Sequence, residues 1–354
     1  MSDPDFSWHG ANASLTMPVD QTAGPWLQPS IVLCLLAILL LASSLIANIL
    51  ITISILCFPK LRTNFNFYLL NIAVSDIIFS VSSLGNFCPL TYYGYYPFSS
   101  GACTAWLYSE FMFSAMTEWT MAMVALDRLV CISWPMFYRK YQSSKYSVII
   151  IAMVWIWLHL LILPSILLDR ATLPDDAASE RCSIDYHAHP GWLITCVILV
   201  FWLPETVTIT AYIRIALKMR SRKKFVDTPS SNSLDSDFRQ GKNEEQPLRL
   251  EGIAKSQTNY AVDTLSTSMR QRRPNKDRKA FRLLSALVLS VIVFCLPADI
   301  YYFVAALDSK WATHVFYQLA TFSTFIHCFL NPLLYHAYSE DMRNAVKSLF
   351  HRSS

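Results

Sequence analysis

Residues 101–135 read GACTAWLYSEFMFSAMTEWTMAMVALDRLVCISWP, and this segment gives the first indication of the fold. It is apolar over the length of a long helix, yet it contains Glu110, Glu118 and the adjacent pair Asp127-Arg128. A charged side chain within a bilayer is costly and usually faces a protein interior or a water-filled cavity. The segment therefore predicts a membrane-spanning helix whose charged side chains have functional roles inside a bundle.

The composition places the whole chain among integral membrane proteins. Of its 354 residues, 53% are hydrophobic and only 15% are charged, unlike the usual soluble domain. A helix crosses the hydrocarbon core with about 20 apolar residues, and the apolar runs of this chain lack the alternation of barrel strands. The predicted fold is an all-α bundle of seven transmembrane helices within residues 30–338, with spans at 30–57, 66–91, 101–134, 146–168, 190–219, 279–306 and 312–338.

Basic residues outside the spans indicate the orientation. Only three of the 29 Lys and Arg residues, Arg170, Arg181 and Lys310, lie on the same side of the membrane as residues 1–29. Because Lys and Arg accumulate on the cytoplasmic side, we expect an extracellular N-terminus in the plasma membrane. The N-glycosylation sequon at Asn12 agrees with this orientation. The first apolar run is long enough to span, so no cleavable signal peptide is expected.

Two polar segments are expected in the cytoplasm. Residues 220–278 are rich in Ser, Thr, Gln, Asn and mixed charges, which predicts a disordered third cytoplasmic loop. Residues 339–354 predict an amphipathic helix and a short tail, because Met342, Val346 and Leu349 recur at helical spacing. Such a helix is expected to lie flat against membrane lipid.

The cysteines predict one disulfide bond. Seven of the nine cysteines lie in or at the ends of spans. Cys103 and Cys182 are the pair that both lie in external, oxidising surroundings. We expect them to be joined, which would attach the external loop to the third span.

Several motifs together resemble those of the rhodopsin-like (class A) G-protein-coupled receptors. Asp127-Arg128-Leu129 ends the third span before Pro135, and Asn331-Pro332-Leu333-Leu334-Tyr335 ends the seventh. Other matching positions are Asn48, residues 69–76, Cys103, Trp155, Cys182, Pro204, Tyr212 and Pro297. The resemblance covers all seven spans. It implies a receptor that binds an extracellular ligand and activates a heterotrimeric G protein, with arrestin and receptor kinases as further partners.

The resemblance also implies an activation switch at the cytoplasmic end of the bundle. Arg128 would be restrained at rest by Asp127 and by Asp277 at the foot of the sixth span. Breaking such an ion pair would shift a two-state arrangement of helices. The structural alternative for Arg128 is a charge that reaches out to the membrane interface. The other switch positions are Tyr212, Pro297, Asn331, Pro332 and Tyr335.

A buried polar core is expected around Asp76 in the second span. A buried carboxylate needs partners, and Asn48 is a candidate. A polar contact between helices and a cation site or relay are both open. The family's sodium site normally adds a Ser and an Asn, whereas Thr117 and His327 stand at the matching positions. These residues argue against a sodium site, and no other metal is expected.

Two departures from the family lie between the outer half and the switch. Glu118 occupies a position where the family normally packs an aliphatic residue against Pro204. The sequence Phe294-Cys295-Leu296-Pro297 lacks the Trp that usually precedes this proline. The family's connection between ligand pocket and cytoplasmic end is therefore altered here.

Two acids are expected to face the ligand. Glu110 stands where amine receptors carry an Asp that pairs with the ligand ammonium group, and Asp299 stands at a pocket-facing position of the sixth span. Two acids on one cavity bind a cation well, which predicts a cationic peptide or amine. They can instead share a proton or pair with internal donors. The other expected ligand-binding residues are Tyr302, Thr321 and Phe325.

Two other functions are open. Proton sensing through His187, His189, His314 and His327 is a second receptor hypothesis. A transporter or channel is the hypothesis of another class, although the sequence lacks the repeats and paired broken helices of transporters. No metal-ligand cluster, phosphate loop or assembled nucleophile indicates an enzyme. We expect no cofactor and no nucleic-acid partner.

Overall fold

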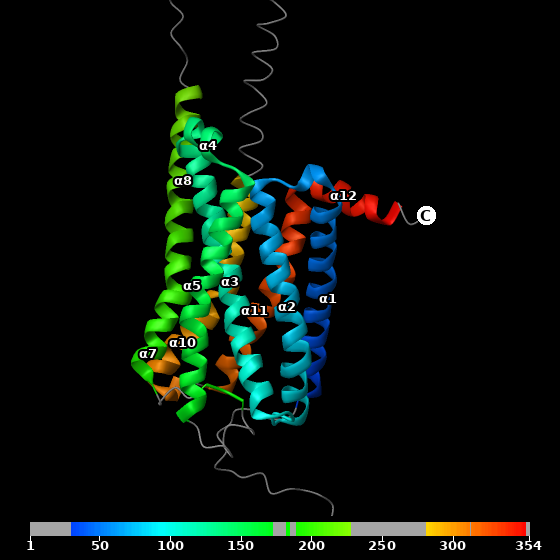
Figure 1. Ribbon diagram of the computed structural model, residues 1–354, viewed down its shortest axis with the longest axis vertical. Coiled ribbons are helices and arrows are strands. Elements are labelled where there is room, and N and C mark those ends of the chain that lie inside the picture. The colour runs from blue at the N-terminus through cyan, green and yellow to red at the C-terminus, as the bar shows by residue number, and fades with distance from the viewer. Residues whose placement is uncertain (1–29, 173–181, 185–188, 228–280, 312, 352–354) are drawn as a thin grey trace, which may run out of the picture.

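The computed structural model describes residues 30–172, 182–184, 189–227, 281–311 and 313–351. Within these ranges the chain forms helices and no strand. The long helices run side by side along the bundle (Figure 1). They are α1 (Ile31–Cys57), α2 (Asn64–Tyr93), α3 (Ser100–Ser133), α5 (Ser144–Thr172), α8 (Leu203–Asp227) and α11 (His314–Tyr338).

Shorter elements complete the spans and join them. Helix α7 (Pro190–Val197) and the π-helical turn η2 (Ile198–Trp202) lead directly into α8. Residues 281–294 are helical and continue, after a turn at Cys295, into α10 (Leu296–Leu307). The connecting elements are the 3-10 turns η1 (Pro59–Leu61) and η3 (Ser309–Trp311) and the helices α4 (Pro135–Tyr141) and α12 (Glu340–His351).

Side-chain caps determine where four of the spans begin. The hydroxyl groups of Ser30, Thr63, Ser99 and Thr313 each accept a hydrogen bond of 3.3 Å from the backbone N–H three residues later. These bonds satisfy donors that the first turn of a helix leaves free. The end of α2 is fixed differently, by Gly94 in the left-handed conformation with φ of 77°.

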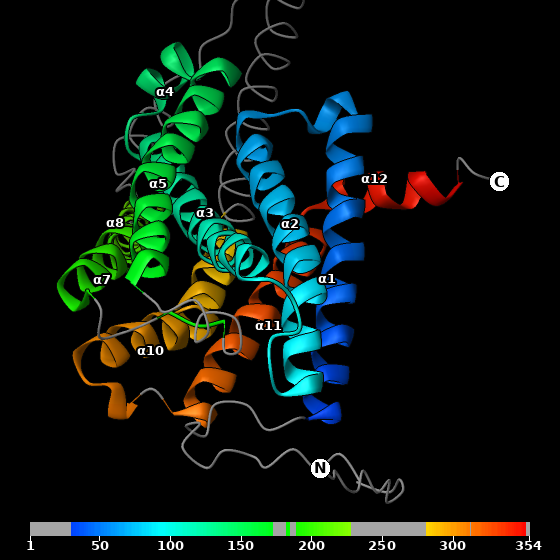
Figure 2. The same cartoon turned by 60° about the horizontal axis from the view of Figure 1, so that its bottom comes forward.

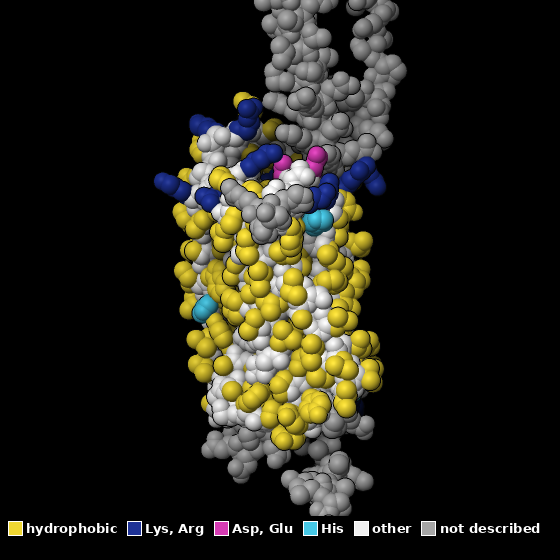
Figure 3. All heavy atoms as spheres, turned by 90° about the vertical axis from the view of Figure 1, so that its right-hand side faces the viewer, with side chains coloured by type: hydrophobic (Ala, Val, Ile, Leu, Met, Phe, Trp, Pro, Cys, Tyr) yellow, Lys and Arg dark blue, Asp and Glu magenta, His cyan; other side chains and the backbone are white. Residues whose placement is uncertain are grey.

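The sides of the bundle are apolar, as a membrane protein requires. Hydrophobic side chains cover the face seen in Figure 3, and Lys and Arg side chains gather near one end of it. Five helical segments are long and apolar enough to cross a membrane on their own, and the bent pair α3 and α4 is a sixth candidate. Helix α11 is more polar, and it packs against α1, α2 and α10 as the seventh member. The fold is the seven-helix bundle that the sequence predicts.

Helix α3 lies in the centre of the bundle. It packs against α2, α5 and α8, as Figure 2 also shows. Cys103 in its first turn is joined to Cys182 by a disulfide bond, and we call this the disulfide end of the bundle. At its other end α3 turns by 118° into α4. Helices α4 and α12 lie at that end, which we call the α12 end (Figure 1).

Two irregular turns coincide with prolines. A proline lacks the backbone N–H and its ring clashes with the carbonyl group four residues earlier. The wide turn η2 precedes Pro204, and the turn at Cys295 precedes Pro297, the second residue of α10. Wide turns of this kind accommodate a residue that the regular helix cannot. They set the direction in which the outer parts of these two spans face the bundle interior.

Some expected boundaries were wrong. Helix α5 continues to Thr172, so Asp169 and Arg170, expected in a loop, lie in its last turns and form an ion pair of 3.0 Å. Helix α8 continues to Asp227, so residues 220–227 are not part of a disordered loop. Lys and Arg are good helix formers, and the segment contains no Gly or Pro before Pro229.

Two expectations concern parts of the chain outside the described residues. Asn12, the expected glycosylation site, lies in residues 1–29. The rest of the expected third loop, with Asp277, lies in residues 228–280. Helix α12 forms where the amphipathic helix was expected, and its Met342 and Ala345 are buried against the bundle.

Candidate functional site

A cavity inside the bundle is lined by all five residues expected to bind the ligand. Glu110 comes from α3, Asp299 and Tyr302 from α10, and Thr321 and Phe325 from α11. The cavity encloses about 460 Å³, including its open mouth.

Two internal donors orient the Glu110 carboxyl group. The Ser83 hydroxyl and the Trp106 indole N–H, the latter at 2.9 Å, both donate to its Oε1. A carboxylate that accepts two hydrogen bonds is well suited to carry a negative charge. From the sequence, internal hydrogen-bond donors were an alternative to a ligand, and such donors are present at Glu110. Both act on Oε1, and Oε2 accepts no hydrogen bond from the described residues.

Asp299 faces the same cavity with a free oxygen. Its side chain is 2% exposed, and its Oδ2 has no hydrogen-bond partner in the described part of the chain. The sequence placed Asp299 correctly in the cavity wall but gave no role to its neighbour Glu205. The carboxyl group of Glu205 lies close enough to repel that of Asp299. Only its position beside Pro204 could have drawn attention to it.

Aromatic rings form much of the remaining wall. Phe111 packs against Tyr302 with ring centroids 5.0 Å apart, and Phe79 packs against Phe325 at 6.0 Å. Phe201 of the turn η2 completes this wall. Aromatic faces attract cations. The cavity therefore combines negative charge with aromatic surface.

Asp76 joins three helices below the cavity. It accepts hydrogen bonds from the Thr117 hydroxyl at 2.9 Å and from the Asn331 amide at 3.1 Å. Asn48, the candidate partner, is buried as expected but does not bond Asp76, since its amide donates to the carbonyl oxygens of Ser44 and Cys328 at 3.0 and 3.2 Å. The Asn48 amide thus satisfies backbone acceptors on two helices, and the Asn331 amide bonds the Asp76 carboxylate instead.

His327 does not take part in this network. It is 2% exposed, and its Nε2 has no hydrogen-bond partner among the described residues. Pro332, next to Asn331 in the interior of α11, is also buried. The arrangement around Asp76 is a polar contact that connects α2, α3 and α11.

The expected switch lies where α3 meets α4. The Arg128 Nε donates to the Asp127 Oδ2 at 2.9 Å, and the guanidinium group lies over the Phe65 ring at 4.7 Å from its centroid. The Tyr138 hydroxyl and the Gln142 amide both donate to the Asp127 Oδ1 at 3.0 Å. The sequence did not predict Tyr138 and Gln142, because only the sharp turn after α3 brings them back to Asp127.

Burial raises the pKa of the Tyr138 hydroxyl above its ordinary value. This hydroxyl therefore stays protonated and can donate to Asp127 at any physiological pH. The guanidinium group of Arg128 opposes the increase and the carboxylate of Asp127 adds to it.

The two switch tyrosines have different surroundings. The Tyr212 hydroxyl donates to the Ser285 hydroxyl at 3.2 Å, and its ring stacks on Phe281. Tyr335 is fully buried, and its hydroxyl has no hydrogen-bond partner within the described ranges. No hydrogen bond joins these two tyrosines in the described structure.

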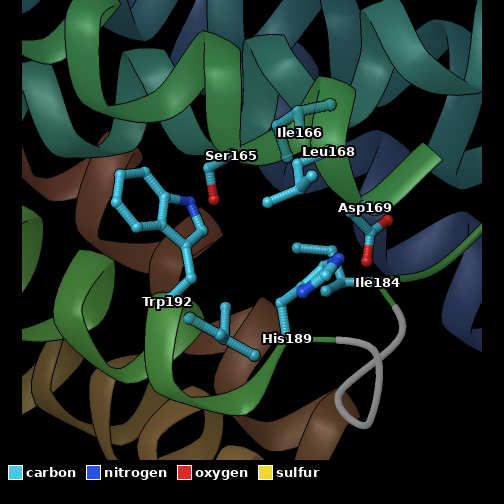
Figure 4. Close-up of a pocket in the computed structure, with 8 residues that line it drawn as sticks. Ser165, Ile166, Leu168, Asp169, Ile184, His189 and Trp192 are labelled. Carbon is cyan, nitrogen blue, oxygen red and sulfur yellow. The ribbon is translucent and has the colours of Figure 1, made fainter. Parts of the chain in front are cut away.

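A second, smaller cavity lies at the disulfide end between α5 and α7. Asp169 and Ser165 of α5, with Ile184, His189 and Trp192, line it (Figure 4). In Figure 4 the His189 ring lies between the Asp169 carboxyl group and Trp192. None of the expected ligand-binding residues lines this cavity. The five expected ligand-binding residues all lie around the cavity of Glu110 and Asp299 instead.

Comparisons with known proteins agree with this geometry. Residues 47–335 match the family described as 7 transmembrane receptor (rhodopsin family). The chain is 28% identical over 180 residues to the muscarinic acetylcholine receptor M4 of Gallus gallus, which covers 51% of this chain and 37% of that receptor. It is 22% identical over 325 residues to the octopamine receptor beta-1R of Drosophila melanogaster, which covers 90% of this chain and 62% of that receptor.

The chain thus spans less than two thirds of the length of these curated relatives. The region that matches the family includes the cavity, Asp76 and the Asp127-Arg128 pair. The members of this family are receptors and not enzymes. The family match favours a receptor over the transporter or channel considered from the sequence. The chain belongs to the rhodopsin family of seven-transmembrane receptors and is a multi-pass membrane protein.

Proposed function

We propose that this receptor binds an organic cation with a protonated amino group and then activates a heterotrimeric G protein. The observation that carries the proposal is the pair of carboxyl groups, Glu110 and Asp299, on one aromatic-lined cavity. A protonated amine in this cavity would meet negative charge and ring faces together. The free oxygens Oε2 of Glu110 and Oδ2 of Asp299 are available to it.

An amine fits the cavity better than a peptide. The cavity is enclosed by side chains of several helices, so it holds a small group or a single side chain. The names of the similar receptors refer to acetylcholine and octopamine, which are small organic cations. A peptide would have to bind mainly outside this cavity. Activation by peptides and not by amines would therefore contradict this assignment.

Features at the two ends of the bundle support an orientation of the receptor in the membrane. The disulfide bond of Cys103 and Cys182 requires an oxidising compartment, and Lys and Arg side chains gather at the α12 end (Figure 3). We therefore assign the disulfide end to the outside of the plasma membrane and the α12 end to the cytoplasm. The ligand would enter at the first end and the G protein would bind at the second.

The hydrogen bonds around Asp127 provide a mechanism for the response. In the described arrangement Asp127 holds the guanidinium group of Arg128, while Tyr138 and Gln142 hold Asp127. Ligand binding would favour a second helix arrangement in which this ion pair is broken. Arg128 would then be free to contact the G protein.

The variant Glu110→Gln tests the proposal. Its amide keeps the size of the side chain but removes the charge that pairs with the ammonium group. We expect the potency of an activating amine to fall at least about tenfold, as the loss of a charge-assisted hydrogen bond predicts. The readout is G-protein activation in cells, with surface expression measured in parallel. Asp308→Asn is the matched control, because Asp308 is exposed at the disulfide end and does not line the cavity.

Proton sensing is the second candidate, favoured by the unpaired ring nitrogens Nε2 of His189 and His327 in the described structure. His187, the fourth of the expected histidines, lies outside the described residues, and His314 lies near Gln318 in α11. Acid titration of signalling without added amine tests this function. A response that His327→Gln abolishes and Glu110→Gln preserves would favour it over amine binding.

A further inference from the structure

Asp299 belongs to a group of three buried acids from three helices. Glu118 of α3 is 3% exposed, Glu205 of α8 is 7% exposed and Asp299 of α10 is 2% exposed. The carboxyl groups of Asp299 and Glu205 both repel that of Glu118. We call these three residues the acid cluster. It lies where the turns before Pro204 and Pro297 interrupt the two spans that face α3.

Each member of the acid cluster has an unused oxygen. Glu118 Oε2, Glu205 Oε1 and Asp299 Oδ2 are buried without a hydrogen-bond partner in the described part of the chain. No described lysine, arginine or histidine forms an ion pair with any of the three. A buried carboxylate without a partner is strongly unfavourable. Three such groups together cannot all be ionised unless a cation joins them.

The acid cluster shares one residue, Asp299, with the ligand cavity. Asp299 belongs to both, because it lines the cavity with Glu110 and interacts electrostatically with Glu118. Glu110 and Glu118 lie eight residues apart on α3, which corresponds to about 12 Å along the helix. Carboxyl groups that a cation can ionise therefore extend from the cavity wall about two helical turns toward the α12 end.

We propose that the natural ligand is a dication, an aliphatic diamine or polyamine, whose first ammonium group binds Glu110 and whose second binds the acid cluster through Asp299. This inference rests on the proposed function and names the chemical class of its ligand. A monoamine can neutralise the acid at one end of the charged region only. A diamine with nitrogen atoms less than about 12 Å apart can reach both ends. Its methylene chain would lie against Phe111 and Phe325.

A metal ion fits the acid cluster less well. A metal site needs several ligand atoms arranged around one point at about 2.0–2.6 Å. No group of three His, Cys, Asp or Glu side chains in the described residues has such an arrangement. An ammonium group on a flexible chain needs only one or two oxygen partners. The spacing of the three acids therefore favours an organic cation.

The test compares diamines with monoamines on the intact receptor. The probes are the straight-chain diamines from diaminopropane to diaminodecane and the alkylamines with the same numbers of carbon atoms. The readouts are G-protein activation in cells and the thermal stabilisation of the purified receptor. We expect one diamine length to be at least about tenfold more potent than its monoamine, the gain expected for an additional charge-assisted hydrogen bond.

Three variants assign the two ammonium groups. We expect Asp299→Asn to remove the advantage of the diamine, because it lowers the potency of the diamine more than that of the monoamine. Glu110→Gln should weaken both probes. Asp299→Glu keeps the charge on a side chain that is longer by one methylene group, so it should restore the advantage at a different diamine length. This restoration also shows that the loss in Asp299→Asn is not a folding defect.

The possible failures are distinguishable. If monoamines bind and no diamine exceeds them, or if Asp299→Asn weakens both probes equally, the dication proposal is wrong and amine binding stands. If neither class of probe activates or stabilises the receptor, the proposed function itself is wrong. If diamines act and Glu110→Gln has no effect, the acid cluster binds them without the assigned partner, which also overturns the proposal.

Discussion

The hydroxyl group of Tyr138 in α4 donates a hydrogen bond of 3.0 Å to the Asp127 carboxylate in α3. The bond connects the short helix after the sharp turn to the acid that holds Arg128. A hydrogen bond to a charged group contributes about 1.5–3 kcal/mol. The helix α4 therefore stabilises the arrangement in which Arg128 is restrained.

We predict that Tyr138→Phe increases signalling in the absence of ligand. Loss of the hydroxyl weakens the hold on Asp127 and shifts the equilibrium toward the active arrangement by about tenfold. Basal G-protein activation at equal surface expression is the measurement. Tyr141→Phe is the matched control, since Tyr141 is an exposed tyrosine of the same helix. Equal basal activity of Tyr138→Phe and the wild type would contradict the role given to this bond.

The variant Arg128→Ala should separate ligand binding from coupling. Arg128 lies at the α12 end, far from the cavity of Glu110 in α3. We expect amine binding to persist, as measured by thermal stabilisation of the purified receptor, while G-protein activation is lost. Normal coupling of this variant would show that Arg128 is only a charge at the membrane interface.

Removal of the disulfide bond should destabilise the receptor. The bond between Cys103 and Cys182 closes a long loop, with 79 residues of sequence separation. Loss of a native disulfide typically costs about 2–5 kcal/mol. Cys103→Ser, Cys182→Ser and the double variant should lower the unfolding temperature by the same amount. A double variant that is much less stable than either single one would show that the cysteines act separately.

Asp76 allows a comparison of two substitutions. Asp76→Ala leaves the donors of Thr117 and Asn331 buried without an acceptor, at a cost of about 1–3 kcal/mol for each. Asp76→Asn keeps one carbonyl oxygen and should cost less. Thermal unfolding of the purified receptor measures both. An alanine variant as stable as the asparagine variant would mean that these hydrogen bonds contribute little.

The helices could be predicted because each apolar run is long enough to cross a membrane. Their ends could not be predicted as well, because they depend on single caps such as Ser99 and Gly94. The same limit explains α8, whose basic segment continues the helix where a polar loop was expected. Hydropathy marks where lipid ends and does not mark where a helix ends.

The cavity was largely predictable and its surroundings were not. Glu110 and Asp299 stand at positions that the family resemblance assigns to the pocket. Asn48 was a candidate partner of Asp76 and does not bond it, because the sequence gives no information on which of several nearby acceptors an amide chooses. Tyr138 was missed because only the sharp turn after α3 brings it back to Asp127, and Glu205 was missed because its neighbours Glu118 and Asp299 are far away in sequence.

The π-helical turn Ile198–Trp202 has a consequence for how the fifth span transmits a signal. Each residue of a helix advances its direction by about 100°, so one additional residue in a turn rotates everything beyond it by that angle. Phe201 in this turn lines the ligand cavity, and Glu205, which follows it in α8, belongs to the acid cluster. Deletion of one residue from this turn would rotate the part of the span before the turn by about 100° relative to α8. The fifth span therefore consists of two helical segments with a fixed rotation between them. That rotation keeps the ligand-contacting part of the span in register with the part that follows it toward the α12 end.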